Sequence, residues 1–155
     1  MDIIVRKAAI DELDTLLQWR MRVLQEVFQL YENDKNYLAI RRNNEAYYRK
    51  HLAEGSHTAC FAVESSVNRI VGCGGICYQS EMPSPDNVSG TNGYLMNIYT
   101  IPEVRGEGVG QKILNFLIDE AKQRGIEKIY LESSDVAKNF YEEIGFVDLK
   151  NYMRL

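Results

Sequence analysis

The chain is poor in the residues that mark disulfide-rich and metal-binding proteins. Its 155 residues include only three cysteines and two histidines. An odd number of cysteines, behind a start that does not resemble a secretory leader, predicts reduced thiols and a cytoplasmic location. Cys73 and Cys77 lie four residues apart, but neither a histidine nor a second cysteine pair accompanies them. We therefore expect no zinc site and no other metal.

Long hydrophobic runs and an excess of positive charge are also missing. No apolar segment approaches the roughly 20 residues that a membrane helix needs, so we expect no membrane partner. Lysine and arginine number 18 against 22 aspartates and glutamates, a formal net charge of −4. This balance disfavours a nucleic-acid partner held by a basic face. No repeat or linker divides the chain, so its length predicts a single domain over residues 1–155.

The most informative segment present is a glycine-rich junction. An apolar run over residues 94–101 ends at Pro102, and glycines then alternate at positions 106, 108 and 110 before an apolar helical pattern. The order predicts a strand, a tight loop and a helix N-terminus. Such a junction gathers unpaired backbone N–H groups at the positive end of the helix dipole, and glycine lets a ligand approach the main chain closely. We expect it to bind a phosphate or pyrophosphate.

Hydrophobic periodicity predicts the other elements. Strands are expected at residues 3–7, 58–64, 70–79, 94–101 and 128–132, with closing strands at 146–147 and 152–155. Helices are expected at residues 11–31 and about 37–54, directly after the glycines, and from an Asp135 cap to Gly145. The order β-α-α-β-β-β-α-β-α-β predicts an α+β fold with a mixed central β-sheet flanked by helices on both faces. The loop at 82–93 is long for a connection, which favours a functional role.

Several kinds of site are compatible with three glycines. A Walker A loop requires Gly-Lys-Ser/Thr, which Gly110-Gln111-Lys112 does not supply. A dinucleotide fingerprint has the spacing Gly-x-Gly-x-x-Gly in a first βαβ unit, whereas this triplet is Gly-x-Gly-x-Gly and lies two-thirds along the chain. A helix entry that binds nothing is the third reading.

Two motifs taken together resemble one enzyme family. Residues 105–110, RGEGVG, resemble the Arg/Gln-x-x-Gly-x-Gly/Ala motif of the GNAT N-acetyltransferases. Residues 137–146, AKNFYEEIGF, are similar to that family's A-x-x-[LF]-Y-x-x-x-G-F helix and turn. One helix and one strand separate the motifs, as in the family. On this resemblance residues 1–155 are identified as a single GNAT N-acetyltransferase domain.

The resemblance implies a reaction and the residues that carry it. An acetyl group would pass from acetyl-CoA to a primary amine of a small molecule, peptide or protein by direct attack, without a covalent enzyme intermediate. Tyr141 would be the catalytic general acid that protonates the thiolate, although a tyrosine in this helix is also typical of a packing face. Loop amides would hold the pyrophosphate, and main-chain groups of the preceding strand would pair with the pantetheine arm. The implied cofactor-binding residues are Ile98, Tyr99, Thr100, Arg105, Gly106, Glu107, Gly108, Val109, Gly110, Gln111 and, where many members have asparagine, Ser134.

Ser134 lies just before the expected cap at Asp135, so its alternative role is capping.

The acceptor side of the site is less specified. Candidate general bases are Glu26, Glu81, Glu103 and Glu132, or a chain of waters, while His51 and His57 are expected to be structural. Acceptor recognition is expected in the first two helices and the 82–93 loop, with Arg20, Arg22, Tyr31, Tyr37, Tyr47 and Tyr48 as possible pocket residues. Two alternatives are a non-catalytic acyl-CoA-binding sensor on the same fold and, more distantly, a nucleotide-binding domain. The family often dimerises, so a homodimer is a possible assembly.

Overall fold

A five-stranded sheet with the spatial order β1-β2-β3-β4-β5 organises the computed structural model, which describes all residues 1–155. Its strands are β1 (Ile3–Lys7), β2 (His57–Glu64), β3 (Arg69–Ser80), β4 (Thr91–Thr100) and β5 (Lys128–Leu131). The first four pair antiparallel, and β5 pairs parallel to β4. The expected α+β fold with a mixed sheet is confirmed.

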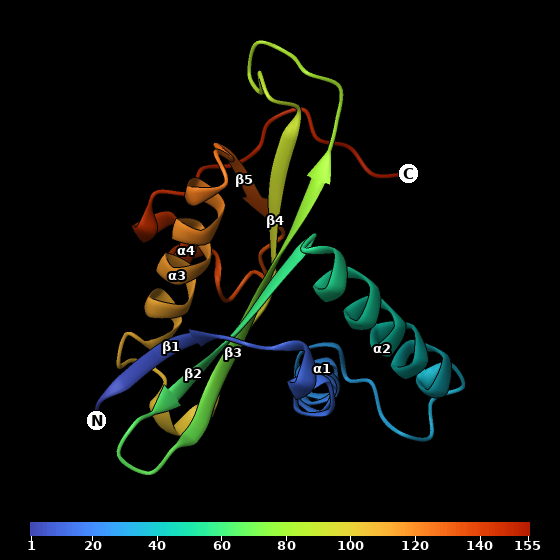
Figure 1. Cartoon of the computed structure of the whole chain (residues 1–155), viewed down its shortest axis with the longest axis vertical. Coiled ribbons are helices and arrows are strands. Elements are labelled where there is room, and N and C mark those ends of the chain that lie inside the picture. Colours follow the sequence, from blue (N-terminus) through green and yellow to red (C-terminus); the bar gives the residue numbers. More distant parts are fainter.

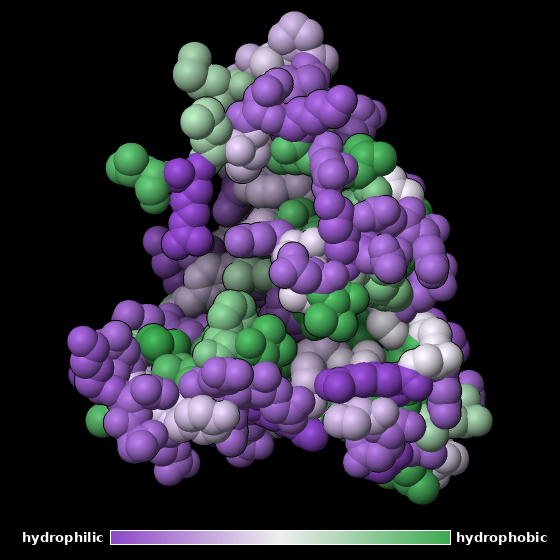
Figure 2. Space-filling view, turned by 180° about the vertical axis from the view of Figure 1, so that it is seen from behind, coloured by the Kyte–Doolittle hydropathy of each residue, from purple (hydrophilic) through white to green (hydrophobic).

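Helices cover both faces of this sheet (Figure 1). Two of them, α1 (Leu13–Phe28) and α2 (Tyr37–Glu54), lie on one face, and α3 (Val109–Gln123) and α4 (Lys138–Ile144) lie on the other. Short 3-10 turns, η1 (Ile10–Glu12) and η2 (Pro102–Val104), precede α1 and the glycine loop. None of these helices combines the length and apolar character needed to cross a bilayer. Seen from behind, the molecule is recessed in its middle, with hydrophobic residues in the recess and mostly hydrophilic residues projecting around it (Figure 2).

The packing of α3 against β3 forms the centre of the core. Ile113, Leu114 and Leu117 recur at helical spacing on α3 and are fully buried. A Cβ on Gly74 of β3 would lie 2.5 Å from Ile113 Cγ2 and 3.0 Å from Leu117 Cδ1. The absence of a side chain at Gly74 therefore lets the helix lie close to the sheet.

The opposite face is closed by an aromatic contact between α2 and the start of β2. Tyr48 and His57 are 4% and 5% exposed. His57 Nδ1 shares a hydrogen bond of 2.8 Å with the Tyr47 hydroxyl. A Cβ on Gly75 would lie 2.7 Å from His57 Nε2, so the imidazole packs directly on the β3 backbone. Burial lowers the pKa of His57 from its usual 6.5 to about 4, which leaves the ring neutral at pH 7.

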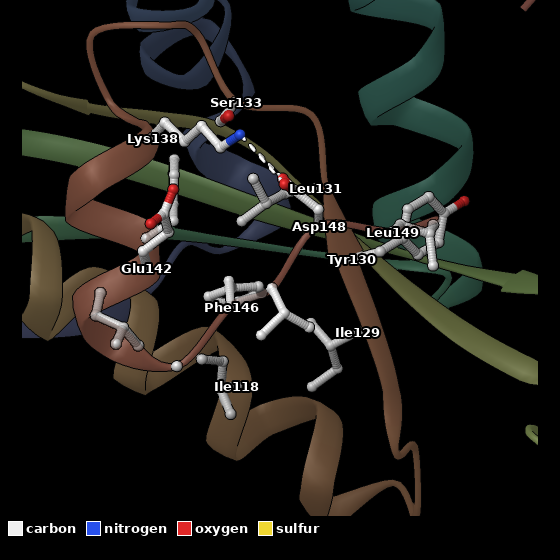
Figure 3. A pocket seen from close by; sticks show the side chains of 14 residues that line it. Ile118, Ile129, Tyr130, Leu131, Ser133, Lys138, Glu142, Phe146, Asp148 and Leu149 are labelled. Atoms are coloured by element: carbon white, nitrogen blue, oxygen red, sulfur yellow. Dashed lines mark hydrogen bonds and ion pairs between the residues drawn. The ribbon is translucent and has the colours of Figure 1, made fainter. Parts of the chain in front are cut away.

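The predicted closing strands at 146–147 and 152–155 are wrong, because the chain beyond α4 joins no sheet. Phe146 packs instead near Ile118 and Ile129, at a hollow of about 480 Å³ lined by α3, β5, α4 and this terminal segment (Figure 3). Lys138 Nζ and Asp148 form an ion pair of 3.1 Å across it. The segment offers only short apolar runs separated by polar residues, so side-chain contacts position it in place of a hydrogen-bonded ladder.

Three other boundaries differ from prediction. The first helix ends at Phe28, since Gln29 adopts a left-handed conformation with φ of 56°. Asp135 does not cap the last helix, which begins at Lys138. The Ser134 hydroxyl oxygen accepts a hydrogen bond of 3.3 Å from the Ala137 N–H and closes a turn ahead of it. The long loop is shorter than expected because β4 already begins at Thr91.

Truncating the core face of α3 should destabilise the whole fold. Leu117 is 0% exposed, whereas Leu38 on α2 is 69% exposed. We expect Leu117→Ala to lower the free energy of unfolding by about 2–5 kcal/mol, through lost burial and a new cavity. Leu38→Ala should change it by less than about 0.5 kcal/mol. Urea unfolding of both variants measures this, and equal losses would contradict the packing described.

Acid should destabilise the protein through His57. Because the folded pKa is about 4 and the usual value is 6.5, the unfolded chain binds the proton more readily between these pH values. The contribution of neutral His57 is complete above pH 6.5 and is lost as the pH falls towards 4, by roughly 3 kcal/mol in total. Unfolding free energies measured from pH 7.5 to 4.5 should have a smaller slope in His57→Gln than in the parent; identical slopes would refute the buried neutral state.

Candidate functional site

A gap opens where β4 and β5 part. The two strands pair from Asn92 with Lys128 to Leu95 with Leu131, and β5 then ends. The partner strand stops there while β4 continues to Thr100. The last residues of β4 therefore leave one edge without a ladder partner, facing the helices α3 and α4.

A bulge lies in β4 beside this gap. Cys73 pairs with Tyr99 and Gly75 with Met96, so that Asn97 and Ile98 both stand opposite Gly74. Asn97 adopts a left-handed conformation with φ of 60°, and the Cys73 thiol donates to its carbonyl oxygen at 3.6 Å. A bulge disrupts the ladder locally and leaves the extra residue unpaired. Backbone polar groups are thereby directed to the wall of the gap.

The glycine loop forms the end of the gap. Gly106 and Gly108 have φ of 85° and 80°, conformations that other residues rarely adopt. The Lys112 N–H donates to the Gly108 carbonyl at 3.1 Å, so the amides of Val109, Gly110 and Gln111 precede the first intrahelical hydrogen bond. A Cβ on Gly106 or Gly108 would meet no atom within 4 Å, so this side of the loop is open.

The gap and the loop enclose a hollow of about 500 Å³. It collects most of the predicted site residues, but Glu107 and Ser134 do not line it. Gly110 allows α4 to approach, since a Cβ there would lie 3.2 Å from the Phe140 ring. The lining residues are Ile98, Tyr99, Thr100, Val104, Arg105, Gly106, Gly108, Val109, Gly110, Gln111, Ala137, Phe140, Tyr141 and Glu143.

Tyr141 stands on the α4 side of this hollow. Its ring packs at 5.2 Å from Phe140 and in a T-shaped arrangement at 5.9 Å from Phe146, measured between centroids. Burial raises the pKa of its phenol above the usual 10.0. The hydroxyl therefore carries its proton at neutral pH. The side chain combines the packing role and the exposure to the hollow that sequence reasoning had treated as alternatives.

The Tyr99 side chain points away from the hollow, towards α1. Its hydroxyl donates to Glu26 Oε2 at 2.5 Å, and Arg105 Nη2 lies 3.8 Å from the same oxygen. The Tyr99 hydrogen bond and the Arg22 guanidinium hold the pKa of Glu26 below its usual range. Glu26 is therefore a poor general base. Only the main chain of Tyr99 is available to a ligand in the gap.

A second pocket, of about 270 Å³, lies on the α1 and α2 side of the sheet. It includes Arg20, Tyr47 and Tyr48 from the predicted set, together with His57. Residues that sequence reasoning missed are Ile40, Asn43, Asn44, Met96 and Asn97. The spacing of positions 40, 43, 44 and 47 on one face of α2 was a signal for the first three, whereas nothing in the sequence located the bulge that carries Asn97.

The other predicted acceptor residues lie elsewhere. Arg22, Tyr31 and Tyr37 line a separate hollow of about 450 Å³ between α1 and α2. The loop before β4 lines neither this hollow nor the pocket at Asn97.

The other candidate general bases line neither the hollow at the glycine loop nor the second pocket. Glu81 bonds Asn87 Nδ2 at 2.6 Å and Lys128 Nζ at 2.9 Å, and these contacts lower its pKa. Glu103 and Glu132 are exposed. No carboxylate lines the second pocket, and no three His, Cys, Asp or Glu side chains gather where they could hold a metal ion.

Curated relatives match this chain over part of its length. An N-alpha-acetyltransferase 30 of Schizosaccharomyces pombe is 34% identical over 65 residues, 40% of this chain and 43% of the relative. A glucosamine 6-phosphate N-acetyltransferase of Trypanosoma brucei brucei is 32% identical over 63 residues, 41% of this chain and 43% of the relative. The matched part thus spans less than half the length of either. An uncharacterized N-acetyltransferase of Escherichia coli, YjgM, is 28% identical over 130 residues, 81% of this chain and 72% of the relative.

Solved structures match the fold over nearly the whole chain. A predicted acetyltransferase of Clostridium acetobutylicum, solved with acetyl-CoA, has a TM-score of 0.87 and 29% identity, covering 99% of this chain and 96% of that one. A GCN5-related N-acetyltransferase of Ralstonia eutropha, at 21% identity, shares the fold with a TM-score of 0.83 over 99% of this chain and 98% of its own. The sequence pattern of the Acetyltransferase (GNAT) family matches residues 14–146. The chain therefore belongs to the GNAT acetyltransferase family.

Proposed function

We propose that this protein transfers an acetyl group from acetyl-CoA to a primary amine. The observation that carries the proposal is the hollow of about 500 Å³ that joins the glycine loop, the bulged end of β4 and Tyr141. Family membership supports the same reaction, as does the similar Clostridium acetobutylicum protein solved with acetyl-CoA.

The site fits the cofactor on physical grounds. Three amides at the start of α3 precede the first intrahelical hydrogen bond, and the helix dipole adds positive potential there, which suits a pyrophosphate. The open edge of β4 offers backbone groups from Ile98 to Thr100 to the amide-containing pantetheine arm, as an added strand would pair. Arg105 is exposed beside the loop, where its Nε donates to the Thr100 carbonyl oxygen at 3.1 Å, and it adds a positive charge there. Contacts of Glu107 and Ser134 with the cofactor stay predictions.

The chemistry divides between the bulge and α4. The amine nitrogen forms a bond to the acetyl carbon, and the C–S bond of the thioester breaks. A backbone amide freed by the bulge at Asn97 and Ile98 would stabilise the oxyanion that develops on the carbonyl, commonly the largest catalytic contribution. The protonated Tyr141 hydroxyl would give its proton to the departing thiolate.

Deprotonation of the amine is assigned to water. Glu26 has a lowered pKa, and its carboxylate already accepts a hydrogen bond from Tyr99. The second pocket contains no acidic side chain that could replace it as a base. Neutral His57 is buried and already bonded to Tyr47, so it serves as part of the pocket wall.

One assay separates the enzyme from the alternative of an acyl-CoA sensor. Acetyl-CoA is titrated into the protein by calorimetry, and free thiol is then followed in the presence of a panel of primary amines. Thiol release that requires an amine supports catalysis. Tight binding without release on any amine would favour the sensor, and heat protection by ATP in place of CoA would favour a nucleotide-binding domain.

A substitution at Gly108 should weaken cofactor binding specifically. The alanine side chain disfavours the left-handed conformation by roughly 1–2 kcal/mol, and the loop relieves this strain by leaving the conformation that presents its amides. We expect Gly108→Ala to raise the Kd of acetyl-CoA about tenfold. Gly125→Ala is a matched control, because Gly125 has φ of 75° with nothing near its Cβ and lies at the other end of α3. An equal Kd of acetyl-CoA in Gly108→Ala and Gly125→Ala would contradict a role of the glycine loop in binding the cofactor.

Removing the Tyr141 hydroxyl should slow turnover without loosening the cofactor. Tyr141→Phe keeps the packing against Phe140 and Phe146, and we expect kcat to fall about 100-fold or more with a nearly unchanged Kd for acetyl-CoA. Tyr152→Phe is the control, since Tyr152 is 65% exposed in the terminal segment. A Tyr141→Phe rate equal to that of the parent would remove Tyr141 from the mechanism.

A further inference from the structure

The second pocket contains a guanidinium group that no carboxylate neutralises. Arg20 on α1 donates from Nε to Asn44 Oδ1 at 3.1 Å and from Nη1 to Asn97 Oδ1 at 3.0 Å. Both acceptors are neutral amides. The arginine forms no salt bridge, whereas its neighbour Arg22 pairs with Glu26 at 3.3 Å.

The two amides are themselves held in a fixed orientation. Asn44 Nδ2 donates to the Ile40 carbonyl at 2.9 Å, and Asn97 Nδ2 points to Cys73 Sγ at 3.8 Å. Each amide therefore turns its oxygen to the guanidinium and fixes it in place. A guanidinium has five N–H donors and two are used here, so three have no partner within the protein.

Nothing else in the surroundings supplies negative charge. Burial raises the pKa of the Tyr47 and Tyr48 phenols, and it raises the pKa of the Cys73 thiol to about 12, so all three are neutral at pH 7. Burial also lowers the pKa of Arg20, which reflects the cost of holding this charge away from water. A half-buried cation without a counter-charge attracts an anion more strongly than an exposed one does.

The pocket lies next to the reacting atoms of the proposed reaction. Met96 and Asn97 line it, and the following residue, Ile98, lines the cofactor hollow. A molecule held at Arg20 therefore lies beside the bulge through which the thioester would be approached. A volume of about 270 Å³ suits a small molecule.

We propose that the acceptor is a small primary amine that also carries an anionic oxygen group, a carboxylate or a phosphate, bound by Arg20 between α1, α2 and the β4 bulge. This inference rests on the proposed acetyl transfer. The step is balanced: the amine nitrogen gains the acetyl carbon and loses one proton to water, the thiolate leaves with a proton from Tyr141, and water returns a proton to the Tyr141 phenolate. Arg20 forms and breaks no bond and determines which amines bind.

The test compares amines that carry an anionic group with matched amines that lack it. Two matched pairs are β-alanine with its amide and O-phosphoethanolamine with ethanolamine, and a wider panel pairs each amino acid with its amide. We expect the preferred anionic amine to exceed its neutral partner at least tenfold in kcat/KM. Preference for the amino acids identifies the carboxylate as the recognised group, and preference for the phosphate compound identifies the phosphate.

Variants of Arg20 show whether this residue makes the distinction. Arg20→Gln should raise KM for the anionic amine at least tenfold while changing kcat, the Kd of acetyl-CoA and KM for the neutral partner less than threefold. Arg20→Lys, which keeps the charge without the planar fork, should be intermediate. Arg42→Gln removes an exposed arginine from α2 and is the control for net charge.

Direct binding keeps this inference separable from the proposed reaction. Calorimetry of the same amines with the parent and with Arg20→Gln, in the presence of CoA, reports the anion site even if no acetyl group moves. Charge-selective binding that is lost in Arg20→Gln supports the site, and absent turnover then counts against the enzyme alone. Equal binding or equal turnover of charged and neutral partners by the parent overturns the inference, even if acetyl transfer is observed.

Discussion

The close approach of α3 to β3 is the constraint on which the site depends. Because Gly74 has no side chain, the side chains of Ile113 and Leu117 pack against its backbone, and the helix lies directly on the sheet. That position fixes the N-terminus of α3 at the open edge of β4. In the proposed reaction an anion-binding loop must be held still relative to the strand that would bind the thioester, and the burial of α3 provides that rigidity.

The bulge in β4 divides the proposed site into two compartments, each of which suits an anionic group. On one side, Ile98 faces a hollow with free amides and a helix N-terminus, features that suit a polyanion and a thioester. On the other side, Asn97 joins Asn44 in fixing the unpaired Arg20. A protein with a net charge of −4 thus concentrates its attraction for anions at a few local positions. Neither compartment requires a basic surface.

The sequence predicted the features that local chemistry determines. The glycine spacing indicated the loop, because few residues other than glycine adopt φ near 80° at positions 106 and 108. The motif around Tyr141 placed that residue on a helix, and the structure brings it to the same hollow as the loop. The second helix was predicted over about residues 37–54 and is observed over Tyr37–Glu54.

The features that were missed arise from tertiary contacts. The bulge depends on the register between β3 and β4, which no short pattern in β4 reveals. The terminal segment contains apolar residues that would suit a strand, but Phe146 packs near Ile118 and Ile129 instead. The sequence left Glu26 as a candidate general base. The hydrogen bond that it accepts from Tyr99 joins residues distant in the sequence, and no local pattern indicates it.

One feature of α1 links the two compartments mechanically. Arg20 and Glu26 lie six positions apart on the same helix, a rise of roughly 9 Å. The first lies in the second pocket, and the second contacts both Tyr99 and Arg105 beside the glycine loop. A helix is stiff over this length, so a displacement at one end is carried to the other. The single helix α1 therefore sets the spacing between the second pocket and the contacts beside the glycine loop.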